Sequence, residues 1–175
     1  MKGLTGGLTQ EDANEPGVRA PWCRGYVGGM STTTRIVRAT PTQVWDVLAD
    51  GWLYPLWVVG ASRMREVDGH WPEPGARLHH SVGVWPLLID DHTEVLEATP
   101  GSRLRLRAKA WPTGEAEVVL HLRARGADTE VVMEEDAVAG PGRLVPAPLR
   151  HLPLHWRNVE ALRRLAFVAE RRAQG

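Results

Sequence analysis

The sequence is poor in cysteine, in long apolar runs and in net charge, and each shortage excludes a class of protein. Cys23 is the only cysteine among 175 residues, which excludes an intrachain disulfide and a zinc site built from thiolates. No apolar run approaches the roughly 20 residues that cross a bilayer, and the N-terminus lacks the apolar core of a secretory signal. The 21 basic and 21 acidic residues balance, so the overall charge does not favour nucleic acid or an anionic membrane. These absences predict a cytoplasmic protein with no nucleic-acid partner and no membrane insertion.

Motifs for cofactors and metals are also absent. The chain has no glycine-rich nucleotide pattern, no zinc-protease helix signature and no serine-nucleophile elbow, and we expect no cofactor. Seven histidines are present, but His79 and His80 are adjacent, so on a strand they point to opposite faces. His92 lies on the next expected strand, yet a third clear ligand is missing. We therefore expect no metal site.

What is present divides the chain into a tail and one domain. Residues 1–30 are rich in glycine and polar residues and have neither helical nor strand periodicity, which predicts a disordered tail. Met30 directly precedes the first structured stretch, so an upstream extension of the reading frame remains an alternative for this tail. Residues 31–173 are long enough for one domain, and 43% of all residues are hydrophobic.

One long amphipathic helix is expected near the end of the chain, from Leu154 to Arg172. At 100° per residue its apolar face carries residues 155, 158, 159, 162, 165, 166 and 169, and the opposite side carries residues 157, 160, 163, 164 and 171. Two residues on the apolar face are polar, His155 and Asn158. They either pack and cap locally or face a cavity and touch a ligand.

Most of the remaining chain reads as strands separated by turn signals. The exception follows the first strand, where Thr40 to Gln43 reads as a capping box with proline at the first helical position. A short helix is expected there, and a second over Trp52–Trp57. The expected strands are Thr32–Ala39, Ser62–Val67, Arg77–Trp85, Leu88–Ala98, Ser102–Trp111, Glu115–Ala124 and Thr129–Ala137.

The fold class that follows is α+β. Connections this short require antiparallel neighbours, and alternation gives the sheet one apolar and one charged face. The only element long enough to cover the apolar face is the last helix. The sequence thus predicts a curved seven-stranded antiparallel sheet wrapped around that helix, with two short helices between strands one and two.

A basic ladder occupies the polar face of one strand, at residues 103, 105, 107 and 109. Neighbouring strands carry Glu94, Glu97, Glu115 and Glu117. Cross-strand pairs of opposite charge explain such a ladder at about 0.2–1 kcal/mol each. We therefore interpret it as a solvated sheet face and not as a nucleic-acid site.

Several short segments together match a known pattern. They are Thr33–Thr40 followed by Pro41-x-x-Val44-Trp45, then Trp57, Gly83-Val84-Trp85-Pro86, Thr129-x-Val131-x-Met133-x-Glu135 and Trp156-Arg157-Asn158-x-Glu160-x-Leu162-x-x-Leu165. On these segments the chain, from about Ser31 to Arg172, resembles the START-like superfamily, also called SRPBCC or Bet v 1-like. It resembles in particular the polyketide cyclase/dehydrase-type members. The resemblance implies a helix-grip fold with a deep apolar pocket, but the superfamily includes cyclases, lipid carriers, toxins and chaperone cofactors.

A pocket between sheet and helix would be lined by the inward residues of both. The same residues would serve in an ordinary core, and the two interpretations differ in whether a cavity of about 300–1,000 Å³ remains. Aliphatic side chains would supply affinity, while Glu135, His155 and Asn158 would orient polar groups of the ligand. The expected lining is Trp57, His80, Val82, Trp85, Leu104, Leu106, Ala108, Val118, Leu120, Val131, Met133, Glu135, His155, Asn158 and Leu162.

Catalysis is the less supported alternative. By period 2, Glu135 faces the cavity if Val131 and Met133 do, and a carboxylate there could exchange protons. His155 is the other weak candidate. The expected role of Glu135 is instead to be held by Arg143, His155 or another donor. Neither Tyr26 nor Tyr54 lies on a pocket-facing strand, which argues against cyclase chemistry.

The sequence therefore predicts a monomer or homodimer that binds, or binds and transports, an aromatic, polyketide-like or lipid-like molecule. The first alternative is a cyclase, aromatase or dehydratase acting on a bound polyketide. The second is a protein-interaction module like a toxin or a chaperone cofactor, which exposed apolar patches would favour.

Overall fold

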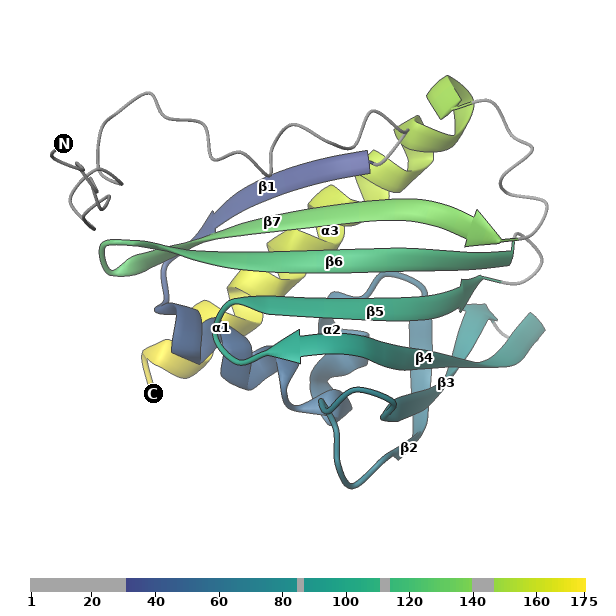
Figure 1. Ribbon diagram of the computed structural model, residues 1–175, viewed down its shortest axis with the longest axis horizontal. Helices are drawn as coiled ribbons and strands as arrows, with labels where there is room; N and C mark the ends of the chain where they lie inside the picture. Colours follow the sequence, from purple (N-terminus) through teal and green to yellow (C-terminus); the bar gives the residue numbers. More distant parts are fainter. Residues whose placement is uncertain (1–30, 85–86, 111–113, 140–146) are drawn as a thin grey trace, which may run out of the picture.

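The computed structural model describes residues 31–84, 87–110, 114–139 and 147–175. The predicted tail, residues 1–30, lies outside the described residues, as does Trp85. Within the described ranges the chain forms seven strands and three α-helices around one sheet (Figure 1). The α+β prediction is confirmed.

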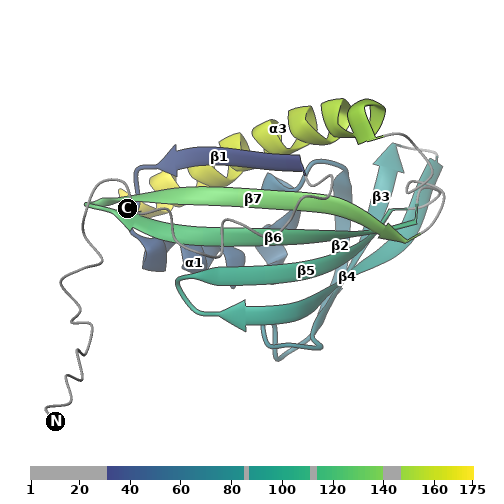
Figure 2. The ribbon, with the colours of Figure 1, turned by 45° about the horizontal axis from the view of Figure 1, so that its top comes forward.

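The sheet is antiparallel throughout, in the order β1-β7-β6-β5-β4-β3-β2. Figure 2 shows how strongly it twists, with β2 and β3 turned away from the direction of β1 and β7. Such twist follows from the handedness of extended L-peptide chains. The strands are β1 (Ser31–Val37), β2 (Ala61–Val67), β3 (Arg77–Val84), β4 (Leu87–Thr99), β5 (Arg103–Ala110), β6 (Gly114–Arg125) and β7 (Asp128–Ala139).

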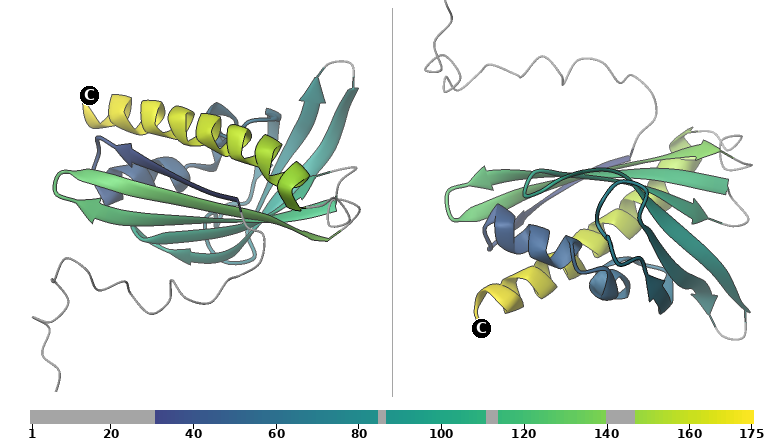
Figure 3. Two further views of the ribbon diagram at one scale, coloured as in Figure 1. Left: turned by 90° about the horizontal axis from the view of Figure 1, so that it is seen from above. Right: turned by 60° about the horizontal axis from the view of Figure 1, so that its bottom comes forward.

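All three α-helices cover the same face of the sheet (Figure 3). They are α1 (Pro41–Leu48), α2 (Tyr54–Trp57) and α3 (Ala147–Ala173), with a 3₁₀ turn over Gly51–Leu53. The long helix α3 packs on β1 and β7 and against α1 and α2. This is the helix-grip arrangement that the sequence predicts. Among the described residues, no helix combines the length and the apolar character needed to span a membrane.

Helix α1 begins where the capping box predicts. The backbone N–H of Gln43 donates to Thr40 Oγ1 at 3.3 Å, and the backbone N–H of Thr40 donates to Gln43 Oε1 at 2.9 Å. Pro41 is the first helical residue, where a missing N–H costs nothing. The helix buries Val44, Trp45, Val47 and Leu48 against the core.

Helix α3 differs from its prediction at one end and on one face. It begins at Ala147, seven residues before the expected start at Leu154. The prediction took Pro153 as a boundary, because an interior proline lacks a donor and crowds the preceding turn, but the helix continues through it. Val159 was expected on the buried face and is exposed. The buried face of the described part is turned toward Ala161, with Asn158, Ala161, Leu162, Leu165, Ala166 and Ala169.

The charged face of the sheet behaves as predicted. Arg103 forms an ion pair with Glu97 at 3.1 Å, and Glu117 forms ion pairs with both Arg105 at 2.5 Å and Arg107 at 3.3 Å. These arginine side chains are close to 40% exposed, so each pair contributes little to stability. The ladder is a set of cross-strand ion pairs.

Candidate functional site

A small cavity lies where β5, β6 and β7 face α2 and α3. Its volume is about 60 Å³, several times what one water needs but well below the 300–1,000 Å³ of typical ligand pockets. Most of the wall is apolar, and Glu135, Arg157 and Asn158 place charged or amide groups on it. The lining residues are Tyr54, Trp57, Val58, Val59, Leu106, Ala108, Val118, Met133, Glu135, Arg157, Asn158 and Ala161.

Glu135 reaches this wall because of strand register. It pairs with Val118 on β6, which in turn pairs with Leu106 on β5, and directly opposed residues share one face of a sheet. The side chain is only 2% exposed. The prediction that period 2 turns Glu135 inward is correct, and the result is a carboxylate at the centre of an otherwise aliphatic row.

Arg157 accompanies that carboxylate. Its guanidinium Nη2 donates to Glu135 Oε1 and forms an ion pair with it. The sequence placed Arg157 on the solvent side of the helix, and its side chain is in fact 38% exposed. An arginine is long enough to start near solvent and deliver its charge inward, because its aliphatic stem packs along apolar surface. Arg157 is the donor for Glu135 that the sequence did not identify.

Two buried polar atoms on this wall have no hydrogen-bond partner among the described residues. One is Glu135 Oε2, the carboxylate oxygen that Arg157 does not use, and the other is Asn158 Nδ2. Asn158 is 2% exposed. Buried polar groups are nearly always paired in proteins, and an unpaired one costs about 1–3 kcal/mol. The cavity therefore presents one unused acceptor and one unused donor.

A second set of polar side chains, those of Tyr54, Thr93 and His80, lies beside the cavity wall. The hydroxyl of Tyr54 and that of Thr93 are 3.0 Å apart, and Thr93 Oγ1 is 3.0 Å from His80 Nε2. The rings of Tyr54 and His80 stack, with centroids 5.3 Å apart. Burial raises the pKa of Tyr54 to about 12, so its phenol is neutral at ordinary pH. Burial also lowers the pKa of His80, which favours the neutral imidazole.

The predicted pocket residues divide into three groups. Those that line the cavity are Trp57, Leu106, Ala108, Val118, Met133, Glu135 and Asn158. Those that are buried in the core without lining it are Leu104, Leu120, Val131 and Leu162. They belong to the buried hydrophobic cluster that the sheet and the helices form together.

The remaining predicted positions lie away from the cavity. His80 is buried behind Tyr54, and Val82 is only half buried on β3. His155 is exposed, and its Nδ1 lies 3.3 Å from Thr33 Oγ1 on β1. Its angle around the helix falls between those of the buried Leu162 and Ala166, but it lies about two helical turns before Leu162, nearer the N-terminal end of α3. His155 is not among the described residues that line this cavity, so its expected roles in ligand contact and catalysis stay predictions.

Tyr54 and Arg157 are the functional candidates that the sequence interpretation missed. The sequence analysis did not count Tyr54 as a pocket residue because it is not on a strand. Helix α2 nevertheless forms one side of the cavity and places the Tyr54 ring on its wall. Ala161 was overlooked although it follows Asn158 by three residues, the spacing of one helix face. That spacing is a signal that could have found it.

Histidine burial predicts how stability depends on pH. Burial is the main cause that lowers the pKa of His80, His92 and His121 in the folded protein, below the ordinary 6.5. In this pH range the unfolded chain then binds more protons than the folded protein does. The free energy of unfolding should therefore decrease as the pH is lowered from about 7.5 to about 5.5. Carboxylates with lowered pKa, such as Glu117, lose their contribution only below about pH 4.5. Urea unfolding at both pH values measures the change.

The control for this prediction is His80→Asn, which removes one of the three groups. Its stability should fall less between the two pH values than that of the wild type. A wild type that gains stability on acidification in this window would contradict the assignment.

Within the described residues, no cluster of three histidine, cysteine, aspartate or glutamate side chains could hold a metal ion.

Solved structures from bacteria share this architecture. A protein of unknown function from Staphylococcus aureus is 9% identical, with a TM-score of 0.66 over 83% of this chain and 96% of that one. A protein from Nitrosomonas europaea is 18% identical, with a TM-score of 0.64 over 83% and 97%. A Rhodobacter sphaeroides protein is 24% identical, with a TM-score of 0.62 over 80% and 91%. At these identities the likeness is one of fold.

The sequence itself identifies the family. No curated protein matches the chain. The family model described as polyketide cyclase / dehydrase and lipid transport matches residues 30–170, which include every described strand and nearly all of α3. The START-like resemblance is thereby confirmed, and the chain belongs to the polyketide cyclase / dehydrase and lipid transport family.

Proposed function

We propose that the protein binds a small hydrophobic molecule carrying a polar group in the cavity between β5–β7 and helices α2 and α3. The observation that carries the proposal is the pair of buried atoms, Glu135 Oε2 and Asn158 Nδ2, that find no hydrogen-bond partner in the described part of the chain, on a mostly apolar wall. A ligand with matching groups would remove two desolvation costs at once. Family membership supports the same function, because the family includes lipid transport and polyketide processing.

The size of the cavity decides how a ligand enters. A volume of about 60 Å³ is too small for a two-ring molecule, so a wall must move. Arg157 is the wall residue best suited to move, because its side chain is partly exposed. In this proposal its aliphatic stem shifts outward on binding, while its guanidinium keeps its ion pair with Glu135.

Filling the cavity tests the proposal. Ala108→Leu adds three carbons at the cavity wall and should weaken binding of the neutral fluorescent probe N-phenyl-1-naphthylamine by about tenfold or more, since the added carbons occupy the ligand's space. Ala124→Leu, at an exposed position of β6, is the matched control and should bind as the wild type does. If the Ala108→Leu protein bound the probe with the same affinity as the wild type, the proposed site would be contradicted.

Native mass spectrometry of protein purified from its own host would show which molecule it carries.

A catalytic function is the second candidate, and one observation favours it. Tyr54 lines the same cavity as Glu135 and is hydrogen-bonded through Thr93 to His80. These groups could hold or move a proton during cyclisation or dehydration of a bound polyketide. Glu135→Gln would then change the product formed from such a substrate, whereas a pure carrier would return it unaltered.

A further inference from the structure

We infer that the cavity selects neutral ligands bearing a hydroxyl or N–H group and rejects carboxylates such as fatty acids. This inference rests on the proposed function, because it specifies the ligand class of the same cavity. It follows from the charges and unused hydrogen-bonding atoms of three residues, Glu135, Arg157 and Asn158.

The charge balance of the wall is the first step. Among the described residues that line the cavity, Arg157 is the only cation, and its charge is already matched by Glu135. An incoming carboxylate would have to compete with Glu135 for the guanidinium and would bring a second negative charge into an apolar space. Two like charges at one buried site repel strongly. The arginine therefore does not make this cavity an anion site.

The unused atoms are the second step. Glu135 Oε2 can only accept a hydrogen bond, so it requires a ligand O–H or N–H. Asn158 Nδ2 can only donate, so it requires a ligand lone pair. A neutral hydroxyl group can donate a hydrogen bond to Glu135 and can accept one from Asn158. A carboxylate can accept a hydrogen bond from Asn158 but has no proton to donate to Glu135.

The apolar part of the wall gives the third step. Tyr54 and Trp57 stand edge to face, with ring centroids 5.3 Å apart, and Met133 lies on the opposite strand wall. Aromatic faces and a thioether pack well against flat rings. A ring compound with a hydroxyl group thus matches both the apolar and the polar parts of the cavity.

Three compounds of one shape test this selectivity by isothermal titration calorimetry at neutral pH. They are 2-naphthol, which is neutral with a hydroxyl, 2-naphthoate, which is an anion, and 2-methylnaphthalene, which has no polar group. The wild type should bind 2-naphthol at least about tenfold more tightly than 2-naphthoate, the ratio expected for one hydrogen bond to a charged group.

Two variants assign the selectivity to its residues. Glu135→Gln frees Arg157 from its carboxylate, so the preference for 2-naphthol over 2-naphthoate should disappear or reverse. Asn158→Leu keeps the side-chain shape but removes the N–H donor, so it should weaken the binding of 2-naphthol and leave the affinity for 2-methylnaphthalene unchanged. Circular dichroism confirms that each variant is folded. If Glu135→Gln does not fold, the wild-type ratio of the 2-naphthol and 2-naphthoate affinities still tests the selectivity, and Asn158→Leu tests the donor.

The outcomes separate this inference from the proposed function. If 2-naphthoate binds the wild type as tightly as 2-naphthol while 2-methylnaphthalene also binds, the cavity takes hydrophobic ligands but the selectivity is wrong. If Glu135→Gln leaves the ratio of the 2-naphthol and 2-naphthoate affinities unchanged, or if Asn158→Leu binds 2-naphthol as tightly as the wild type does, these residues do not act as inferred. If none of the three compounds binds, the proposed function itself fails.

Discussion

Replacing Arg157 with methionine should lower the free energy of unfolding by about 2–3 kcal/mol, because it leaves the Glu135 carboxylate buried without its partner. Loss of one partner from a fully buried pair costs more, but Arg157 is 38% exposed and water screens part of its charge. Chemical denaturation at neutral pH, compared with the wild type, measures the difference. The change is a large one for a single substitution.

Two further variants identify the cause. Arg164→Met removes an arginine four residues from its partner Glu160 on the exposed side of the same helix, and it should change stability by less than about 1 kcal/mol. The double variant Arg157→Met with Glu135→Gln removes both charges and should recover most of the loss. An Arg157→Met protein as stable as Arg164→Met would mean that the ion pair contributes nothing.

Leu120→Ala should lower the free energy of unfolding by about 2–5 kcal/mol, since it opens a void in a packed core. Leu120 is fully buried on β6 and pairs with Leu104 and Met133 on the strands to either side. It does not line the cavity, so at a temperature where the protein stays folded, binding of N-phenyl-1-naphthylamine should change little. Thermal unfolding and probe titration on the same sample test both statements.

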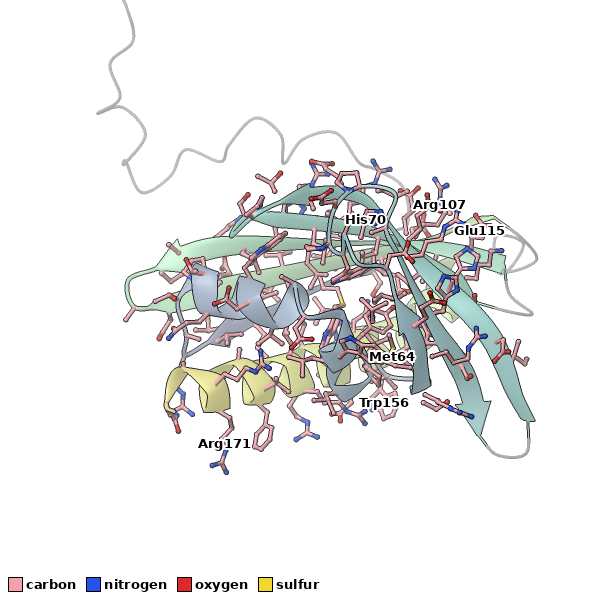
Figure 4. All side chains as sticks on the ribbon, turned by 90° about the horizontal axis from the view of Figure 1, so that it is seen from below. Met64, His70, Arg107, Glu115, Trp156 and Arg171 are labelled. Carbon is pink, nitrogen blue, oxygen red and sulfur yellow. The ribbon has the colours of Figure 1, made fainter. Side chains whose placement is uncertain are left out.

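The matched control is Phe167→Ala on the outer side of α3. Phe167 is 62% exposed and lies under Arg171, 5.4 Å from the guanidinium carbon to the ring centroid. Figure 4 shows Arg171 pointing away from the sheet at this end of the helix. Its removal should change stability by no more than about 0.5 kcal/mol. If Leu120→Ala weakened probe binding as strongly as Ala108→Leu does, the division between core and cavity would be wrong.

The facing of the strands and the antiparallel pairing of consecutive strands were predictable because they depend on local pattern. The alternation Leu104, Leu106 against Arg103, Arg105 is repeated on neighbouring strands, and short turns leave antiparallel pairing as the one possible geometry. The capping box at Thr40 and Gln43 is likewise a matter of four adjacent residues. No distant part of the chain is needed to decide any of these.

Candidate site residues were predictable only where the backbone direction alone decides contact. Glu135 and Val118 were found because period 2 sets the face of a strand. Arg157 was missed because a long side chain can reach past the face on which its Cα lies. His155 was misplaced because a helical wheel gives the angle around α3 but not which neighbour occupies that angle.

The sequence by itself determined a curved antiparallel sheet with a helix across its apolar face, since periodicity and turn chemistry act within a few residues. Only the tertiary structure decided which inward residues meet a cavity and which meet one another. That depends on where α2 and α3 rest on the sheet, and so on packing between segments that are far apart in the sequence. The ion pair between Arg157 and Glu135, and the two polar atoms left beside it, exist only once those segments are in place.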